Sequence, residues 1–258
     1  MSDVTVVIPF YNPGLYLIDA VKSVFNQTYE DWKMILVDDC STDNSILGVK
    51  SYLDDPRITL IKNKENLGQS NSLNIGLSAV ETPFMIQLDG DDWLCESALE
   101  LLMKEASSLP DDVAVISGNI RIFNENNAQK QIIKKGRLFK NRYDFLLSNL
   151  SVWPRFYRTS ALNYVGGWPT DDPFDGRFNE DKRILLRLIE HFRFHWIDNV
   201  LYVHRIHNTN QTKDLLSYET ITKWTVRNAL KRWGDQYEPV FIKSGGWVIL
   251  KKLIPKQK

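Results

Sequence analysis

Short apolar runs alternate with amphipathic stretches along roughly the first 115 residues. The runs are rich in β-branched residues, as is typical of strands buried on both faces; they are Val4–Ile8, Met34–Val37, Ile58–Ile61, Phe84–Leu88 and Val113–Ile116. Between them, apolar residues recur at helical spacing over Leu15–Phe25, Asn44–Leu53, Ser70–Ala79 and Glu96–Ala106. This alternation predicts an open α/β sheet with right-handed crossovers.

The pattern loosens beyond residue 118. Asn119–Arg137 is polar and predicts a hairpin or an insertion, whereas Trp153–Phe178 is dense in aromatic residues without a clear period and is interpreted as a binding loop. Regular spacing returns with a helix over Asn179–His191 and a strand over Arg193–Val203, and the chain is expected to be helical from Tyr218 onward. We find no internal repeat or low-complexity linker, so a second independent domain is not indicated.

The composition is that of an ordinary globular protein, with 258 residues, 43% of them hydrophobic and 25% charged. It excludes a disordered chain, a collagen and a disulfide-stapled miniprotein. Cys40 and Cys95 have no partner at zinc-ligand spacing and are interpreted as reduced structural thiols. We expect a cytoplasmic protein, because we see neither a leader pattern nor an apolar run of about 18 residues.

The net charge of zero conceals an asymmetry along the chain. Residues 1–100 hold 16 acidic and 6 basic side chains, and residues 101–258 hold 16 acidic and 26 basic ones. Such a division is typical of an acidic cation site that faces a basic anion site, or of a basic tail for a membrane or a nucleic acid.

Polar residues follow three of the predicted strands, in Pro9–Asn12, Asp38–Ser41 and Asp89–Asp92. Ligands of open parallel sheets bind outside the carboxyl ends of the strands. Carboxylates gathered there repel one another unless a cation or hydrogen-bond donors compensate them, so we expect a divalent metal, Mn²⁺ or Mg²⁺, together with phosphate. A solvated acidic turn is the alternative, and the position directly after a buried strand favours a metal site.

Two further groups are candidates for chemistry. Glu180 and Asp181 begin a predicted helix, where acids ordinarily serve capping, but the aromatic residues before them favour a general base near a partly dry pocket. Arg205 and His207 follow a strand on one face, where they can serve a metal or a phosphate. The chain has no G-x-G-x-x-G, P-loop, G-x-S-x-G or H-E-x-x-H motif, so dehydrogenases, P-loop kinases and serine hydrolases are unsupported.

Taken in order, these motifs resemble those of the family 2 nucleotide-sugar glycosyltransferases, which are inverting enzymes with a GT-A fold. The resemblance covers about residues 4 to 212 and rests on Val6–Asn12, Val37–Asp43, Glu65–Gly68 with Asn74 and Gly76, Leu88–Asp92, Glu180–Asp181 and Arg205–His207. It implies a GT-A-type, mostly parallel Rossmann-like sheet flanked by helices. This chain departs from the family pattern in having Ser72–Leu73–Asn74 for Ala-Arg-Asn, His204 for Tyr and Cys40 where Gly is common.

The resemblance also implies roles for single residues on the donor side. Pro9, Tyr11 and Asp39 would surround the nucleoside, with Asp39 accepting a hydrogen bond from uracil. Asp89 would face the ribose or the donor sugar, and Asn74 would belong to the same donor site.

On the reaction side, the resemblance implies that Asp91 binds the metal, with Asp92 beside it and His207 completing the metal or diphosphate site. Arg205 would lie close to the diphosphate. Asp181 would be the general base, and Glu180 would support it.

The expected function is therefore a metal-dependent, inverting transfer from a nucleotide-diphosphate sugar, with a UDP-sugar as the first expectation. The acceptor would be a hydroxyl of a glycan, a protein or a lipid-linked molecule, in the synthesis of a cell-surface or exported glycan, and no nucleic-acid partner is expected. A polyprenyl-phosphate sugar synthase and a non-catalytic nucleotide-sugar-binding protein are the alternatives.

We expect one glycosyltransferase domain over residues 1–212, with a nucleotide-binding half at 1–117 and an acceptor half at 118–212, followed by a helical basic tail at 213–258. Residues 241–258 contain five lysines and no acid. One interpretation is an anchor on an anionic membrane, with the protein peripheral on its inner face. The other, which we favour because Gly245–Gly246 interrupts the run, is a C-terminal helix packed on the same domain.

Overall fold

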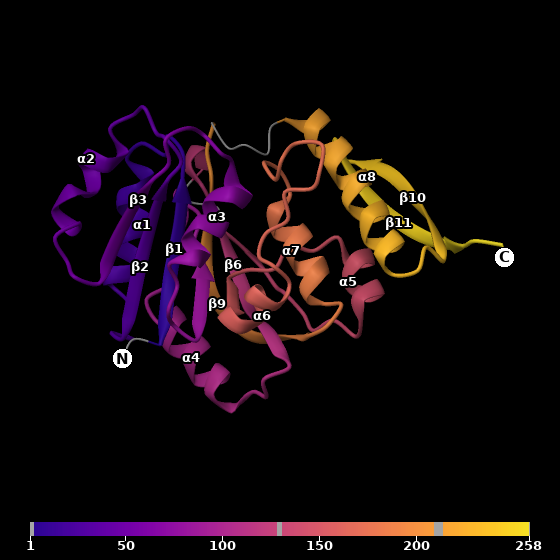
Figure 1. Ribbon diagram of the computed structural model, residues 1–258, viewed down its shortest axis with the longest axis horizontal. Coiled ribbons are helices and arrows are strands. Elements are labelled where there is room, and N and C mark those ends of the chain that lie inside the picture. Colours follow the sequence, from indigo (N-terminus) through magenta and orange to yellow (C-terminus); the bar gives the residue numbers. More distant parts are fainter. Residues whose placement is uncertain (1–2, 128–130, 209–213, 258) are drawn as a thin grey trace.

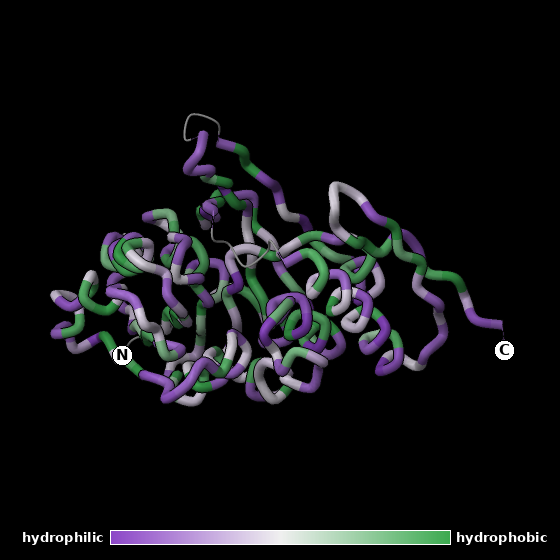
Figure 2. The backbone as a smooth tube through the Cα atoms, turned by 90° about the horizontal axis from the view of Figure 1, so that it is seen from above, coloured by the Kyte–Doolittle hydropathy of each residue, from purple (hydrophilic) through white to green (hydrophobic). Residues whose placement is uncertain are grey.

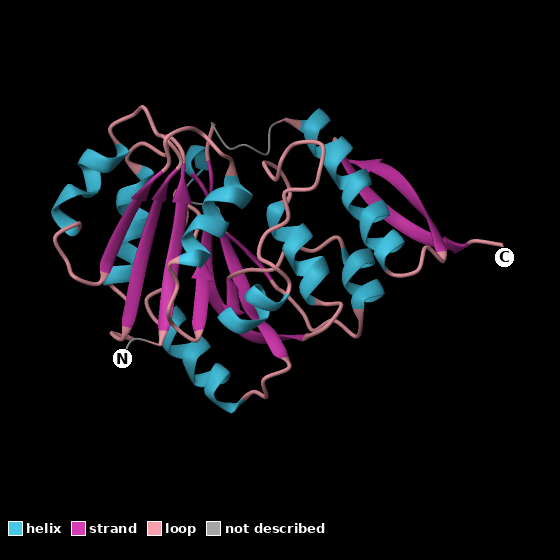
Figure 3. Cartoon of the chain, in the orientation of Figure 1, coloured by secondary structure: helices cyan, strands magenta, loops and turns pink. Residues whose placement is uncertain are grey.

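The computed structural model describes residues 3–127, 131–208 and 214–257, and a large sheet forms its centre (Figure 1). Helices cover the sheet on both faces, as Figure 3 shows. Nine strands join in the order β3-β2-β1-β4-β8-β6-β9-β5, with β7 paired to β6. Their bounds are β1 Val4–Phe10, β2 Trp32–Asp38, β3 Ile58–Lys62, β4 Phe84–Gln87, β5 Trp93–Leu94, β6 Val113–Asn124, β7 Ile132–Lys134, β8 Arg155–Arg158 and β9 Arg193–Ile206.

Strands β1 to β4 form the parallel half of the sheet. β1 pairs in parallel with both β2 and β4, and β3 continues the sheet beyond β2. The order of strands therefore reverses beside β1, which is where open α/β sheets bind their ligands. These parallel pairings confirm the parallel sheet predicted from the sequence, with β1 and β2 almost fully buried and the edge strand β3 partly exposed.

Eight α-helices accompany the sheet in the described residues: α1 Tyr16–Phe25, α2 Ser45–Val49, α3 Gln69–Ser78, α4 Ala98–Ser108, α5 Arg142–Ser148, α6 Thr159–Tyr164, α7 Glu180–Leu188 and α8 Leu215–Arg232. One apolar core includes α1 and α4, and a second includes α3, α7 and α8. α3 lies so close to β1 that a Cβ at Gly76 would be 2.6 Å from a methyl group of Val7. A glycine is required there for the helix to reach the sheet.

The middle of the chain is more regular than its sequence suggests. β7 pairs antiparallel with β6, so the hairpin expected within Asn119–Arg137 is confirmed. The irregular loop expected over Trp153–Phe178 is wrong in its first part, because β8 lies between β4 and β6 and leads into α6. β8 has an arginine at each end, so its two buried residues, Phe156 and Tyr157, form too short an apolar run to predict a strand.

The C-terminal tail is also different from the prediction. Its first part is the helix α8, but β10 (Tyr237–Ser244) and β11 (Trp247–Pro255) form an antiparallel hairpin, so the helix expected after residue 241 is wrong. Gly245 and Gly246 both have positive φ angles and make the turn between the strands. The predicted domain boundary at residue 212 and the last lysine, Lys258, lie outside the described residues. Within the described ranges, none of the helices combines the length and hydropathy that a bilayer-spanning helix requires.

Candidate active site

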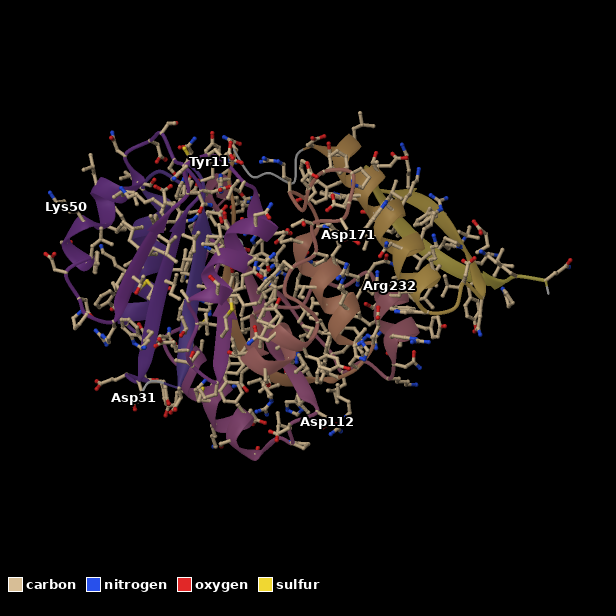
Figure 4. The ribbon with its side chains drawn as sticks, in the orientation of Figure 1. Tyr11, Asp31, Lys50, Asp112, Asp171 and Arg232 are labelled. Carbon is tan, nitrogen blue, oxygen red and sulfur yellow. The ribbon has the colours of Figure 1, made fainter. Side chains whose placement is uncertain are left out.

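The carboxyl ends of β1 and β2 form one side of the candidate site. Tyr11 is 52% exposed at this edge, where Figure 4 labels it, whereas Pro9 is buried within β1 in register with Val37. Asp39 is buried, and its carboxylate accepts hydrogen bonds from the backbone N–H groups of Leu67 and Gly68. Asn63 donates a third bond to it. Asp39 therefore holds the loop before α3 in place, and a contact with uracil stays a prediction.

The loop after β4 places three aspartates in three different environments. Asp89 and Asp91 are partly exposed, but Asp92 is fully buried. The Asp92 carboxylate accepts hydrogen bonds from the Tyr202 hydroxyl and the backbone N–H of Arg205, and it lies 3.1 Å from Nδ1 of His204. Burial raises the pKa of this carboxyl. Three protein groups surround Asp92, which therefore ties the loop to β9, and its expected part in the metal site stays a prediction.

His207 and Asp91 meet directly at the end of β9. Nε2 of His207 lies 2.9 Å from Oδ2 of Asp91, and the imidazole is buried. Asp91 and His207 offer one carboxylate oxygen and one imidazole nitrogen, which are too few ligands to fill the coordination shell of Mn²⁺ or Mg²⁺. The described residues contain no group of three side chains that could hold a metal ion. The pair fits a cation that takes its other ligands from phosphates and water.

Arg205 is paired with two carboxylates in the described part of the chain. Its guanidinium lies 2.6 Å from Asp19 and 3.0 Å from Glu125, and its Nε donates to the carbonyl of Asp91. The side chain is buried and lies over the ring of Trp93. Arg205 thus joins α1, the turn that follows β6 and the loop after β4, and its expected role beside the diphosphate stays a prediction.

Arg155 is the site residue that sequence reasoning missed. It is 1% exposed on β8, and its Nη2 lies 2.6 Å from Asp89 while its Nη1 lies 3.5 Å from Asp181. Its guanidinium also lies over the ring of Trp153, 4.2 Å from the centroid. One buried cation therefore connects the carboxylate expected on the donor side with the carboxylate expected to be the base.

The first turn of α7 presents both predicted catalytic carboxyls. The side chain of Asp181 is 22% exposed, and its Oδ1 accepts a bond from the backbone N–H of Lys182. Burial, together with the negative charge of Asp181, raises the pKa of Glu180 to about 8. Burial lowers the pKa of Lys182 to about 7, and its Nζ lies over the ring of Phe145. Asp181 is the one of these groups that also reaches Arg155.

The loop that precedes α7 is fixed by contacts with α3. Both polar atoms of the Asn74 amide form hydrogen bonds with the backbone of Trp168, so Asn74 positions this loop, and its place in the donor site stays a prediction. Arg183 pairs with Asp171 and Asp172 at the other side of the loop, where Figure 4 labels Asp171. A Cβ at Gly176 would lie 2.5 Å from that of Ser70, so the loop packs tightly on the start of α3.

Comparisons with known proteins agree with this architecture. The family model described as Glycosyl transferase family 2 matches residues 5–166, which is more than half of the 258 residues. The GalNAc(5)-diNAcBac-PP-undecaprenol beta-1,3-glucosyltransferase of Campylobacter jejuni is 33% identical over 157 residues, which cover 58% of this chain and 50% of that protein. Across the curated relatives, this chain spans between 21% and 56% of their length.

Solved structures match over most of the chain. S. aureus TarS in complex with UDP-GlcNAc aligns with a TM-score of 0.67 at 18% identity, covering 89% of this chain and 66% of that one. The mannosyltransferase PcManGT from Pyrobaculum calidifontis, in complex with GDP-Man and Mn²⁺, aligns with a TM-score of 0.65 at 16% identity, covering 89% and 64%. These likenesses identify the fold as the GT-A arrangement. The chain therefore belongs to glycosyltransferase family 2, as the family model identifies it.

Proposed function

We propose that this protein transfers a sugar from a nucleotide-diphosphate donor to a hydroxyl acceptor, with inversion at the anomeric carbon. The single observation that carries the proposal is the Arg155 guanidinium, which lies against Asp89 on the donor side and Asp181 on the α7 side. These contacts support a candidate base beside the position where the donor sugar would lie. The complexes of TarS with UDP-GlcNAc and of PcManGT with GDP-Man support a nucleotide-sugar donor, and a UDP-sugar is our first expectation.

In the proposed reaction, the acceptor oxygen attacks the anomeric carbon as the bond to the diphosphate breaks. The bonding electron pair leaves with the nucleoside diphosphate, and the hydroxyl proton passes to the carboxylate of Asp181. Arg155 orients that carboxylate and still has Asp89 as a partner once Asp181 is neutral. Because attack and departure lie on opposite sides, an α-linked donor gives a β-linked product.

Asp91 and His207 are the residues that would hold Mn²⁺ or Mg²⁺, since they are brought together at 2.9 Å and leave room in the coordination shell for phosphate oxygens. The cation would supply neutralisation of the charge that develops on the departing diphosphate. The Mn²⁺ in the PcManGT complex supports this choice.

The acceptor is proposed as a glycan, and a lipid-linked glycan in particular, because the Campylobacter jejuni relative is named for an undecaprenol-linked acceptor. The cytoplasmic location and the division of the domain at residue 117 stay predictions.

Nucleotide release from a panel of UDP- and GDP-sugars tests the proposal, with water as the acceptor. We expect turnover with at least one donor in Mn²⁺ and none in excess EDTA. Failure of every nucleotide-sugar to turn over, with binding retained in a thermal-shift assay, would support a non-catalytic binding protein instead.

A further inference from the structure

The C-terminal hairpin has an inner face that is covered and an outer face that is open. Leu250 and Val248 are buried on the inner face, and Phe241 and Leu253 pack against the same core as α8. The hairpin lies beyond α8 at one end of the molecule (Figure 1). The apolar side chains on the inner face of the hairpin are therefore buried by packing within the chain, whereas the outer face is exposed to solvent.

The register of the hairpin determines which residues share the outer face. Residues directly opposite one another in an antiparallel pair point to the same side. Ile242 is opposite Ile249, Val240 is opposite Lys252, Glu238 is opposite Ile254 and Ser244 is opposite Trp247. Ile242 and Ile254 are 38% and 44% exposed on this face, whereas Trp247, 39% exposed, has its ring against Tyr218 of α8. The tube in Figure 2 shows hydrophobic and hydrophilic stretches alternating along this part of the chain.

Basic side chains accompany this apolar face. Lys251 and Lys252 are exposed, and within the described ranges neither has an ion-pair partner, whereas Lys243 pairs with Glu219 and Lys256 pairs with Asp235. Residues 213–258 hold ten Lys or Arg and four Asp or Glu, a net charge of 10 − 4 = +6. Residues 1–212 hold 22 and 28, a net charge of 22 − 28 = −6. Residues 213–258 therefore carry a net positive charge, and the rest of the chain carries a net negative charge.

We propose that the outer face of the β10–β11 hairpin docks on an anionic lipid surface. Exposed apolar side chains such as Ile242 and Ile254 can enter the interfacial region of a bilayer while lysines meet its headgroups, and this face offers both kinds of contact side by side. A second copy of the chain suits the face less well, because the contact would bring together two tails that each carry a net charge of +6. A nucleic acid would use the lysines but leave the isoleucines exposed to water.

The docked hairpin would lie next to the candidate active site. The ring of Trp247 contacts that of Tyr218, with centroids 5.5 Å apart, and Tyr218 contacts Phe178 at 5.4 Å. Phe178 comes just before α7, which carries Glu180 and Asp181. A lipid surface under the hairpin would therefore be adjacent to the α7 side of the site, where an acceptor attached to lipid would enter. The docking itself does not depend on the proposed transfer reaction.

Vesicle co-sedimentation of the full chain tests the docking. We compare vesicles of phosphatidylcholine alone with vesicles of phosphatidylcholine mixed with phosphatidylglycerol. The wild type is expected to bind the anionic vesicles and to dissociate at high salt. Lys251→Glu with Lys252→Glu should weaken that binding by at least about tenfold, and Lys50→Glu with Lys104→Glu is the matched control of equal net charge, which should keep it.

A second pair of variants separates lipid docking from simple attraction between charges. Ile242→Ser with Ile254→Ser should also weaken binding, whereas Leu47→Ser with Leu138→Ser, at exposed positions elsewhere, should not. Urea unfolding verifies that each variant folds. Equal binding of the hairpin variants and their controls, or no binding of the wild type to anionic vesicles, would overturn the proposal. A wild-type dimer that the isoleucine variants dissociate would identify a second copy as the occupant instead.

Discussion

Replacing Arg155 by Met tests the link between the two carboxylates most sharply. The change keeps a long side chain over Trp153 but leaves Asp89 and Asp181 without their shared cation. Removing one partner of a buried ion pair costs about 3–5 kcal/mol. Because the side chains of Asp89 and Asp181 are 21% and 22% exposed, water can hydrate both in part, and we expect the low end of that range, about 3 kcal/mol.

Arg155→Lys separates charge from geometry. A lysine keeps the positive charge, but a single ammonium group cannot reach two carboxylates with separate donors as the guanidinium does. We expect a smaller loss of stability, about 1 kcal/mol, together with a fall in kcat of at least about tenfold, since the base is no longer held in place. The KM for the donor should change little.

Urea unfolding and steady-state nucleotide release are the two assays. Arg193→Met is the matched control, because it removes an exposed pair with Asp112 and should cost less than about 1 kcal/mol without changing turnover. The reasoning is refuted if Arg155→Met unfolds within about 1 kcal/mol of the wild type, or if it retains the wild-type kcat.

Three other changes have defined outcomes. Gly176→Ala should lower the free energy of unfolding by about 2 kcal/mol in urea, because φ is +78° and the new Cβ would collide with Ser70; an unchanged midpoint would contradict this. As the pH rises from 4.5 to about 8, the free energy of unfolding of the wild type should fall relative to that of Glu180→Gln, because folded Glu180 retains a proton that the unfolded chain has already released. Parallel pH profiles of the two proteins would refute this. His207→Ala should raise the Mn²⁺ concentration for half-maximal nucleotide release by at least about tenfold, whereas His195→Ala should not; equal values would remove His207 from the metal site.

The parallel half of the sheet was predictable from the sequence because its strands are continuous apolar runs. The same placement rule brought the polar segments after β1, β2 and β4 to one edge of the sheet, as the structure has them. What the rule cannot supply is the partner of each carboxylate. Asp91 and Asp92 are adjacent and chemically alike, yet one meets His207 and the other is enclosed by Tyr202 and the end of β9.

Three features of the structure have physical causes that the sequence reveals only in part. Arg155 was overlooked because the sequence around it was interpreted as an irregular binding loop, whereas it lies in β8, buried between carboxylates that come from distant segments. The hairpin did carry a signal, since Gly245–Gly246 between two apolar stretches is a turn pattern, but the preceding helical spacing led to the prediction of a continued helix. The family resemblance implied a role for Arg205 beside the diphosphate, but it could not reveal the ion pairs with Asp19 and Glu125, which depend on long-range packing.

The rate of nucleotide release by Asp181→Asn, measured beside the wild type in saturating Mn²⁺, tests the central claim most directly. The substitution keeps the size of the side chain and removes the proton acceptor, so the account predicts a loss of about 10²- to 10⁴-fold in kcat. Asp175→Asn removes the same charge from the neighbouring loop, at a left-handed position that asparagine tolerates, and should retain the wild-type rate. A folded Asp181→Asn variant that releases nucleotide at the wild-type rate would contradict the account.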